Sequence, residues 1–324
     1  MTTIVEVRAD DAATVGELLD VYARSQDGRW DTPWTATEKR VRMASTSPYE
    51  RELRFLARDA GGEPVGWGLL SLADTDNTDL AWVELGVVPE RRGRGHGAVL
   101  LEHLLDLSRG EGRRTAVAGA SWPVGEETSG GRRFLEAHGF AVGLVDAHRV
   151  LTLPVALDEV EPSGGYRLSS WTGRCPDAWA PEYAALLGAL LAEAPSGDMA
   201  WEPEVYDVDR LRHAESELDA MARVAVTTVA VAPDGALAGH TRLVVPSGDL
   251  LRVFQWDTLV LPAHRGHRLG LAMKVRNLHV AAPAIGPRTE VHTWNAEVNG
   301  PMIDVNAAMG FELVEMAGEM QRSL

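Results

Sequence analysis

A strand–turn–helix pattern occurs twice in the chain, and this repetition constrains the fold more than any other feature. Four residues of the first turn recur 173 positions later: Pro89 as Pro262, Arg92 as Arg265, Gly93 as Gly266 and Gly97 as Gly270. The separation exceeds the period of about 20–50 residues that is typical of solenoid repeats. A chain of 324 residues is also long enough for two domains. We therefore predict a duplicated domain.

Hydrophobic periodicity predicts the same order of elements around both turns. Strands are expected over 52–60, 64–73, 80–88 and 115–121, and again over 223–232, 237–246, 250–261 and 288–294. Helices are expected over 10–24, 35–46, 178–193 and 207–221, and one helix follows each turn. Segment 156–165, rich in Glu, Pro and Gly, interrupts the pattern. The prediction is an α+β protein with two tandem domains, residues 1–156 (the N half) and 165–324 (the C half).

Charge and cysteine content exclude several classes of function. The chain has 31 basic and 47 acidic residues, a net charge of −16, so neither nucleic acid nor an anionic membrane is an expected partner. Its single cysteine, Cys175, excludes a disulfide within the chain and a cysteine-based zinc site. No apolar run approaches the ~20 residues of a membrane span, and we expect a cytoplasmic protein without a metal. Lys39 and Lys274 are the only lysines, which we attribute to codon composition.

The two glycine-rich turns have the chemistry of a phosphate site. Glycines let consecutive backbone N–H groups point into one concavity, and the helix that follows adds the positive end of its dipole. The lysine that a nucleotide P-loop requires is missing from both turns, and the glycine spacing differs from the dinucleotide fingerprint. A pyrophosphate is therefore the favoured ligand, and a purely structural turn is the alternative.

The motifs around these turns resemble those of a known family. Arg92, Gly95 and Gly97, preceded by Val87-Val88-Pro89, resemble the acyl-CoA pyrophosphate loop of the GCN5-related N-acetyltransferases (GNAT). The second turn is similar but has Arg268 where the middle glycine of the family motif stands. Asn306, four residues before Gly310-Phe311, occupies the position of the family's tyrosine. The tandem arrangement is similar to that of mycothiol synthases.

The resemblance implies a fold and a donor. Each half should be a GNAT-like domain with a mixed, mostly antiparallel central sheet flanked by helices. The donor would be acetyl-CoA, attacked directly by a primary amine through a tetrahedral intermediate. The expected acetyl-CoA-binding residues are, in the N half, Val87, Val88, Arg92, Gly93, Arg94, Gly95, His96 and Gly97, and in the C half, Leu259, Val260, Arg265, Gly266, His267, Arg268, Leu269, Gly270, Asn295 and Asn299.

The resemblance favours the C half as the catalytic one, with Asp257 and Asn306 as its catalytic residues. Asn295 and Asn299 follow its fifth predicted strand, where the family binds the cofactor, whereas the N half has Leu135 in the tyrosine position. The N half has the more regular glycine turn, and its Glu84 corresponds to Asp257. Regular strand alternation would turn Asp257 away from the usual position of the base, so a β-bulge is needed to bring it round.

The acceptor should bind beneath the segment that joins the first two helices of the C half. This segment holds Trp201, Glu202, Glu204 and Tyr206, and no basic residue lies between positions 193 and 209. Aromatic faces and carboxylates suit a small cationic amine. Trp30, Asp31 and Trp34 occupy the corresponding place in the N half. A protein that binds acyl-CoA without turnover, as a sensor or regulator, is the alternative function.

Overall fold

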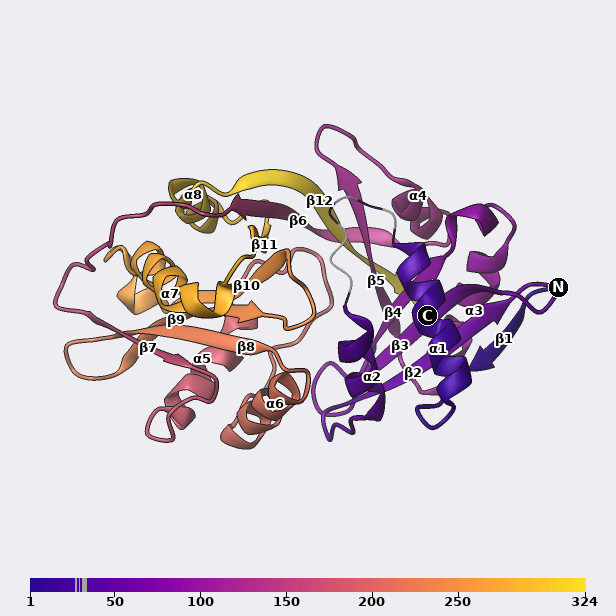
Figure 1. The fold of residues 1–324 in the computed structure, drawn as a ribbon, viewed down its shortest axis with the longest axis horizontal. Coiled ribbons are helices and arrows are strands. Elements are labelled where there is room, and N and C mark those ends of the chain that lie inside the picture. The colour runs from indigo at the N-terminus through magenta and orange to yellow at the C-terminus, as the bar shows by residue number, and fades with distance from the viewer. Residues whose placement is uncertain (27, 29, 31–33) are drawn as a thin grey trace.

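The computed structural model describes residues 1–26, 28, 30 and 34–324 and has two lobes (Figure 1). The elements of the N half are β1 (Thr3–Glu6), α1 (Ala12–Ser25), α2 (Ala36–Ala44), β2 (Glu50–Arg58), β3 (Pro64–Ala73), β4 (Leu80–Val87), α3 (His96–Gly110), β5 (Thr115–Pro123), α4 (Gly130–Ala137) and β6 (Ala141–Thr152). Those of the C half are β7 (Arg167–Thr172), α5 (Ala180–Glu193), α6 (Val208–Ala220), β8 (Val224–Val231), β9 (Leu237–Val245), β10 (Arg252–Val260), α7 (Leu269–Ile285), β11 (Glu290–Ala296), α8 (Gly300–Met309) and β12 (Glu312–Ser323). The predicted helices and strands are present with small shifts of their ends, and the edge strands β1 and β7 are additional.

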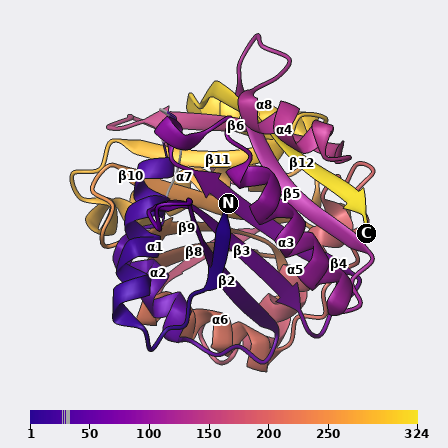
Figure 2. The ribbon, with the colours of Figure 1, turned by 90° about the vertical axis from the view of Figure 1, so that its right-hand side faces the viewer.

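The helices cover both faces of the sheet because each carries an apolar stripe. In the N half, α3 buries Leu100, Leu101 and Leu104 on one face. The opposite face is covered by α1 and α2, whose apolar side chains pack with Leu56 and Trp67. We call this the α1–α2 face. In the C half, α7 and α5 likewise lie on opposite faces (Figure 2).

The described residues form a continuous sheet in the order β1-β2-β3-β4-β5-β12-β6-β11-β10-β9-β8-β7. Within it, β4 pairs with β5 and β10 with β11 in parallel, and the other neighbouring strands are antiparallel. The expected α+β class with a mixed, mostly antiparallel sheet is confirmed.

Each parallel pair separates after a short contact. The β4–β5 pairing runs from Leu80↔Thr115 to Trp82↔Val117, and the β10–β11 pairing ends at Phe254↔His292. Beyond these residues the strands diverge towards the glycine-rich turns. The divergence frees backbone groups of β4 and β10 that a continuous ladder would use.

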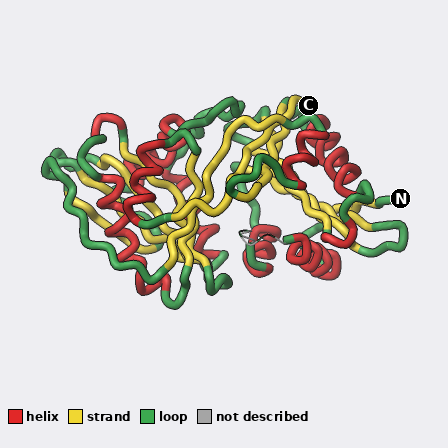
Figure 3. Tube along the Cα trace, turned by 90° about the horizontal axis from the view of Figure 1, so that it is seen from above, coloured by secondary structure: helices red, strands yellow, loops and turns green. Residues whose placement is uncertain are grey.

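The two halves exchange their long closing strands at the centre of the sheet. The C-terminal strand β12 lies between β5 and β6 of the N half, and β6 in turn pairs with β11 of the C half. The view from above shows these long strands crossing from one lobe to the other (Figure 3). Residues near the C-terminus therefore form part of the N-half sheet.

Candidate functional site

The N-half turn, residues 92–97, has the geometry of an anion cradle. Gly93 and Gly95 have φ angles of 72° and 84°, and α3 begins at His96. In the described part of the chain, the backbone N–H groups of residues 93–97 donate to no backbone carbonyl. Open N–H groups at a helix N-terminus suit a phosphate or pyrophosphate. The residues present therefore fit the diphosphate of an acyl-CoA.

Arg92 and Arg265, the arginines that begin the two turns, donate hydrogen bonds to backbone carbonyl oxygens. Arg92 donates from Nε to the carbonyl oxygen of Val87 (2.9 Å) and from Nη2 to that of Ser25 (3.0 Å). Arg265 repeats the first contact with Val260 (3.2 Å) and forms an ion pair with Glu193 (2.8 Å). These arginines position the turns that the sequence assigned to acetyl-CoA.

The other predicted residues of the N-half turn differ in exposure. His96 is buried, and its Nδ1 lies 2.9 Å from Oγ1 of Thr2. Arg94 is exposed beside the turn, and Val88 belongs to the core beneath it. Gly97 faces Phe134, which a Cβ would approach to 3.4 Å.

The C-half turn, residues 265–270, has a similar backbone with two differences. Gly266 has a φ of 84°, and Arg268 adopts a left-handed φ of 61° where the N half has Gly95. The segment between the halves also lies against this turn, because the N–H of Ser163 donates to the carbonyl of His267 (3.2 Å). Leu269 and Leu259 are buried in the core. The C-half turn is thus less open than its counterpart.

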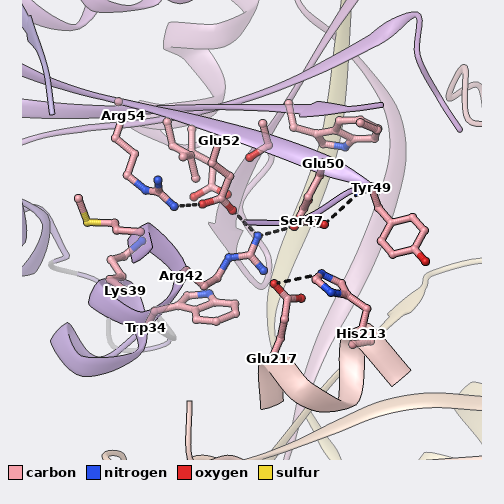
Figure 4. Close-up of a pocket in the computed structure, with 18 of the residues that line it drawn as sticks. Trp34, Lys39, Arg42, Ser47, Tyr49, Glu50, Glu52, Arg54, His213 and Glu217 are labelled. Carbon is pink, nitrogen blue, oxygen red and sulfur yellow. Dashed lines mark hydrogen bonds and ion pairs between the residues drawn. The ribbon is translucent and has the colours of Figure 1, made fainter. Parts of the chain in front are cut away.

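A cavity of about 570 Å³ lies on the α1–α2 face of the N half and is completed by α6 of the C half. Its size is that of small-molecule sites in general. Figure 4 shows polar side chains from both halves turned towards one another. Its charged and aromatic walls include Tyr22, Trp34, Lys39, Arg42, Tyr49, Glu50, Glu52, Arg54, Trp67, Trp82, Glu84, Glu204, Tyr206, Arg210, His213 and Glu217.

The arginines of the cavity are neutralised by carboxylates. Arg42 contacts both Glu50 (2.6 Å) and Glu52, and Arg54 also contacts Glu52. On the other side, Arg210 of α6 is paired with Asp76 (2.5 Å) and Glu204 (3.0 Å). These pairs hold the walls and leave little net positive charge for a ligand.

Glu84 and Lys39 are charged residues of the cavity wall that form no ion pair with another described residue. Glu84 lies on β4 two residues beyond the last β4–β5 pair, and its side chain is exposed to the cavity. Desolvation by the surrounding walls raises its pKa, and the charge of Lys39 partly opposes this. Burial lowers the pKa of Lys39, whose Nζ lies 3.8 Å from the ring centre of Tyr22. A carboxylate beside the strand divergence with a raised pKa has the properties of a general base.

The bulge that Asp257 requires is present in β10. Gln255 pairs with Leu243 and Thr258 with Thr241, so β10 gains one residue over β9. The Asp257 carboxylate is then held by Arg242, with Oδ2 2.5 Å from Nη2. This ion pair occupies the predicted base, whereas Glu84 makes no comparable contact within the described residues.

Asn306 and Asn295 lie together in the C half. Asn306 is fully buried; it accepts a hydrogen bond from Nζ of Lys274 and donates to Oδ1 of Asn295. Burial lowers the pKa of Lys274 to about 7. Asn299 caps α8 by accepting from the N–H of Met302 (3.4 Å). The side chains of Asn306 and Asn299 thus have hydrogen-bond partners within the C half, and their predicted functions stay predictions.

The predicted acceptor segment crosses from the C half onto the N half. The N–H of Glu202 donates to Oδ1 of Asn77 (2.7 Å), and Trp201 packs against Leu80 and Val117. The segment therefore lies between the halves: Tyr206 also packs with the C-half core of α5 and α6, and the expected cap of a C-half site stays a prediction. Glu204 and Tyr206 line the N-half cavity, together with Trp34. Asp31 lies outside the described residues.

Sequence reasoning missed Lys39, Glu52 and His213 as wall residues. Lys39 and Glu52 belong to a helix and a strand that were predicted. Neither prediction shows that the two side chains line the same cavity. His213 comes from α6 of the other half, and no local pattern places α6 on the N half. The rarity of lysine in the chain was the one available signal for Lys39.

Two further features are absent from the described residues. No group of three or more His, Cys, Asp or Glu side chains there is arranged to hold a metal ion. None of the helices described has the length and apolar character needed to cross a membrane.

Comparisons with known proteins agree with this fold. Residues 18–140 match the model of the Acetyltransferase (GNAT) family. The whole chain matches a tandem GNAT protein from the clavulanic acid biosynthesis pathway, solved without AcCoA, with a TM-score of 0.85, 29% identity and 98% of that chain covered. A GCN5-related N-acetyltransferase from Sphaerobacter thermophilus matches 99% of this chain and is covered to 95%, with a TM-score of 0.69 and 15% identity, which supports the fold alone. No match was found among curated proteins.

Proposed function

We propose that this chain is a tandem member of the GNAT family, that it transfers an acyl group from acyl-CoA to a primary amine, and that the N half contains the reaction site. The match of residues 18–140 to the GNAT family model and the similarity of the whole chain to a tandem GNAT protein support acyl transfer. One observation supports the choice of the N half. The side chain of Glu84 lines the cavity, next to the point where β4 and β5 diverge.

The proposed reaction uses acetyl-CoA as a substrate, with its diphosphate at the N-half turn. The amine nitrogen attacks the thioester carbonyl carbon, and a C–N bond forms through a tetrahedral intermediate. The Glu84 carboxylate accepts the proton that the amine loses. The C–S bond then breaks, and the CoA thiolate takes a proton from solvent.

The two units proposed from the sequence are residues 1–156 and 165–324. In this proposal the C half contributes side chains to the cavity of the N half. Its α6 and the segment before it supply Glu204, Tyr206 and His213 to the cavity. Catalysis in the C half through Asp257 is the second candidate, because Asp257 lies at the bulge of β10. Its ion pair with Arg242 argues against it as a free base.

A pair of matched variants tests the choice of half. Glu84→Gln and Asp257→Asn each replace a carboxylate by an amide of nearly the same shape, and CoA release is followed with a thiol reagent over a panel of primary amines. We expect Glu84→Gln to lower kcat by about 10²–10⁴-fold, the range of general-base catalysis. A loss confined to Asp257→Asn would move the reaction to the C half.

The non-catalytic alternative is tested on the unmodified protein. Calorimetric binding of acetyl-CoA without thiol release in the presence of any amine would favour a sensing or regulatory function. Amine-dependent thiol release with formation of the N-acyl product would exclude that alternative.

A further inference from the structure

We infer that the acceptor amine carries a carboxylate, as an amino acid does, and that Lys39 binds this carboxylate while Glu84 faces the amine. This inference rests on the proposed N-half function and names its substrate class. It differs from the purely cationic acceptor that the sequence favoured.

Lys39 is placed to receive an anion from the cavity. Its ammonium group lies 3.8 Å from the ring centre of Tyr22 and 5.3 Å from that of Trp67, which fixes it at the cavity wall. Figure 4 shows Lys39 on α2 beside the paired arginines. Within the described residues, no carboxylate lies within ion-pairing distance of Lys39. A cation held against aromatic rings without a direct ion pair favours a ligand that supplies one.

The arginines nearby do not offer the same function. Arg42, Arg54 and Arg210 each contact at least one carboxylate of the protein. An anionic group on the ligand would have to displace these carboxylates, whereas no carboxylate of the described residues forms an ion pair with Lys39. Lys39 is therefore the favoured partner for a ligand carboxylate.

Glu84 supplies the complementary charge. Lys39 and Glu84 affect each other's ionisation, which places them near one another in the same cavity, yet they form no ion pair within 4 Å in the described structure. An amine and a carboxylate on one small molecule satisfy both groups. A purely cationic acceptor would satisfy Glu84 and leave Lys39 facing a like charge.

The wild-type test compares each amino acid with its carboxamide. The two molecules share the amine and the side chain, and differ in the charge that Lys39 is inferred to bind. We expect kcat/KM for the best amino acid to exceed that of its carboxamide by at least about 10-fold. The amine of the carboxamide is the less basic one, so a preference for the acid cannot come from a larger fraction of free amine. Equal values, or a preference for the carboxamides, would overturn the inference.

The variant test uses Lys39→Met, which keeps a long apolar side chain against Tyr22. The preference for acid over carboxamide should fall about 10-fold or more, and Lys39→Arg should restore part of it. Arg40→Met, an exposed cation at the next position of α2, is the matched control and should leave the preference unchanged. A preference that survives in Lys39→Met would contradict a carboxylate site at Lys39. If Lys39→Met does not fold, Lys39→Arg and the wild-type comparison decide.

Binding separates this inference from the proposed function. Calorimetric titration of the amino acid and its carboxamide into the protein with CoA requires no turnover. Binding of the acid alone, lost in Lys39→Met, would uphold the carboxylate site even if no acyl transfer occurred. Acyl transfer to carboxamides and acids alike, with equal binding, would uphold the proposed function and reject the carboxylate site.

Discussion

Arg223, at the start of β8, and Glu38, on α2, form a buried ion pair between the two halves. The Arg223 Nε lies 2.7 Å from the Glu38 Oε1, and the two side chains are 5% and 2% exposed. The Arg223 guanidinium also lies 4.1 Å from the ring centre of Trp34. Glu38 completes the capping box of α2 with Thr35, so one carboxylate both starts this helix and attaches it to the C half.

Glu38→Gln should destabilise the protein substantially. Glutamine can keep the capping interaction but leaves the guanidinium of Arg223 buried without a counter-charge. Breaking a buried pair in this way costs about 3–5 kcal/mol. Urea unfolding should show this loss in the free energy of unfolding. Asp10→Asn, which removes the exposed pair with Arg8, is the control, and a similar small change in both variants would contradict the prediction.

Gly95→Ala should weaken acyl-CoA binding at the N-half turn. Its φ of 84° lies in the left-handed region, which costs a residue with a Cβ roughly 1–2 kcal/mol. Relaxation of the turn would misalign the N–H groups that cradle the diphosphate. Calorimetry with acetyl-CoA should therefore give a higher Kd.

Gly16→Ala provides the control for that substitution. Gly16 lies within α1, and a Cβ there meets no atom within 4 Å. Alanine within a helix stabilises by roughly 0.5–1 kcal/mol relative to glycine. Unchanged acetyl-CoA binding in Gly95→Ala would show that the C-half turn, or neither turn, holds the donor.

The sequence was sufficient for local structure because local structure follows from periodicity and turn chemistry. The strand at 64–73 was predicted with its observed ends. The bulge in β10 was anticipated as the condition for turning Asp257, since alternation fixes which residues share a face.

The site itself depends on contacts that no local pattern encodes. No local pattern in residues 312–323 predicts the insertion of β12 between β5 and β6. The contact of α6 with the N half includes pairs such as Arg210–Asp76, which join residues far apart in the sequence. The scarcity of lysine was attributed to composition, yet burial lowers the pKa of both Lys39 and Lys274.

The acid limb of the activity profile should reflect Glu84. Burial raises the pKa of this carboxyl, so kcat/KM should fall, as pH decreases, at a pH above the ordinary glutamate value of 4.5. The positive charge of Lys39 stabilises the carboxylate, so Lys39→Met should move the limb to higher pH. Profiles of kcat/KM from pH 5 to 9, with Arg40→Met as the control, measure this shift. An acid limb that stays in place in Lys39→Met would show that another group acts as the base.

Glu319 on the exchanged strand should make the protein less stable as pH rises. Burial, with the nearby charges of Asp146 and Glu84, raises its pKa to about 7, and burial raises that of Asp146 to about 6. The folded state therefore favours the protonated carboxyls. The contribution of Glu319 to stability is fully present below the ordinary pKa of 4.5 and is lost as pH rises to about 7, by roughly 3 kcal/mol.

Glu319→Gln should remove this loss, because glutamine stays neutral in the same place. The variant should match the wild type in thermal stability near pH 4.5 and exceed it at pH 8, which thermal unfolding across this range measures. Glu312→Gln, at the exposed start of the same strand, is the control and should leave the slope unchanged. Parallel stability curves for the wild type and Glu319→Gln would mean that the carboxyl is ionised at no cost, so that the centre of the exchanged sheet is open to water.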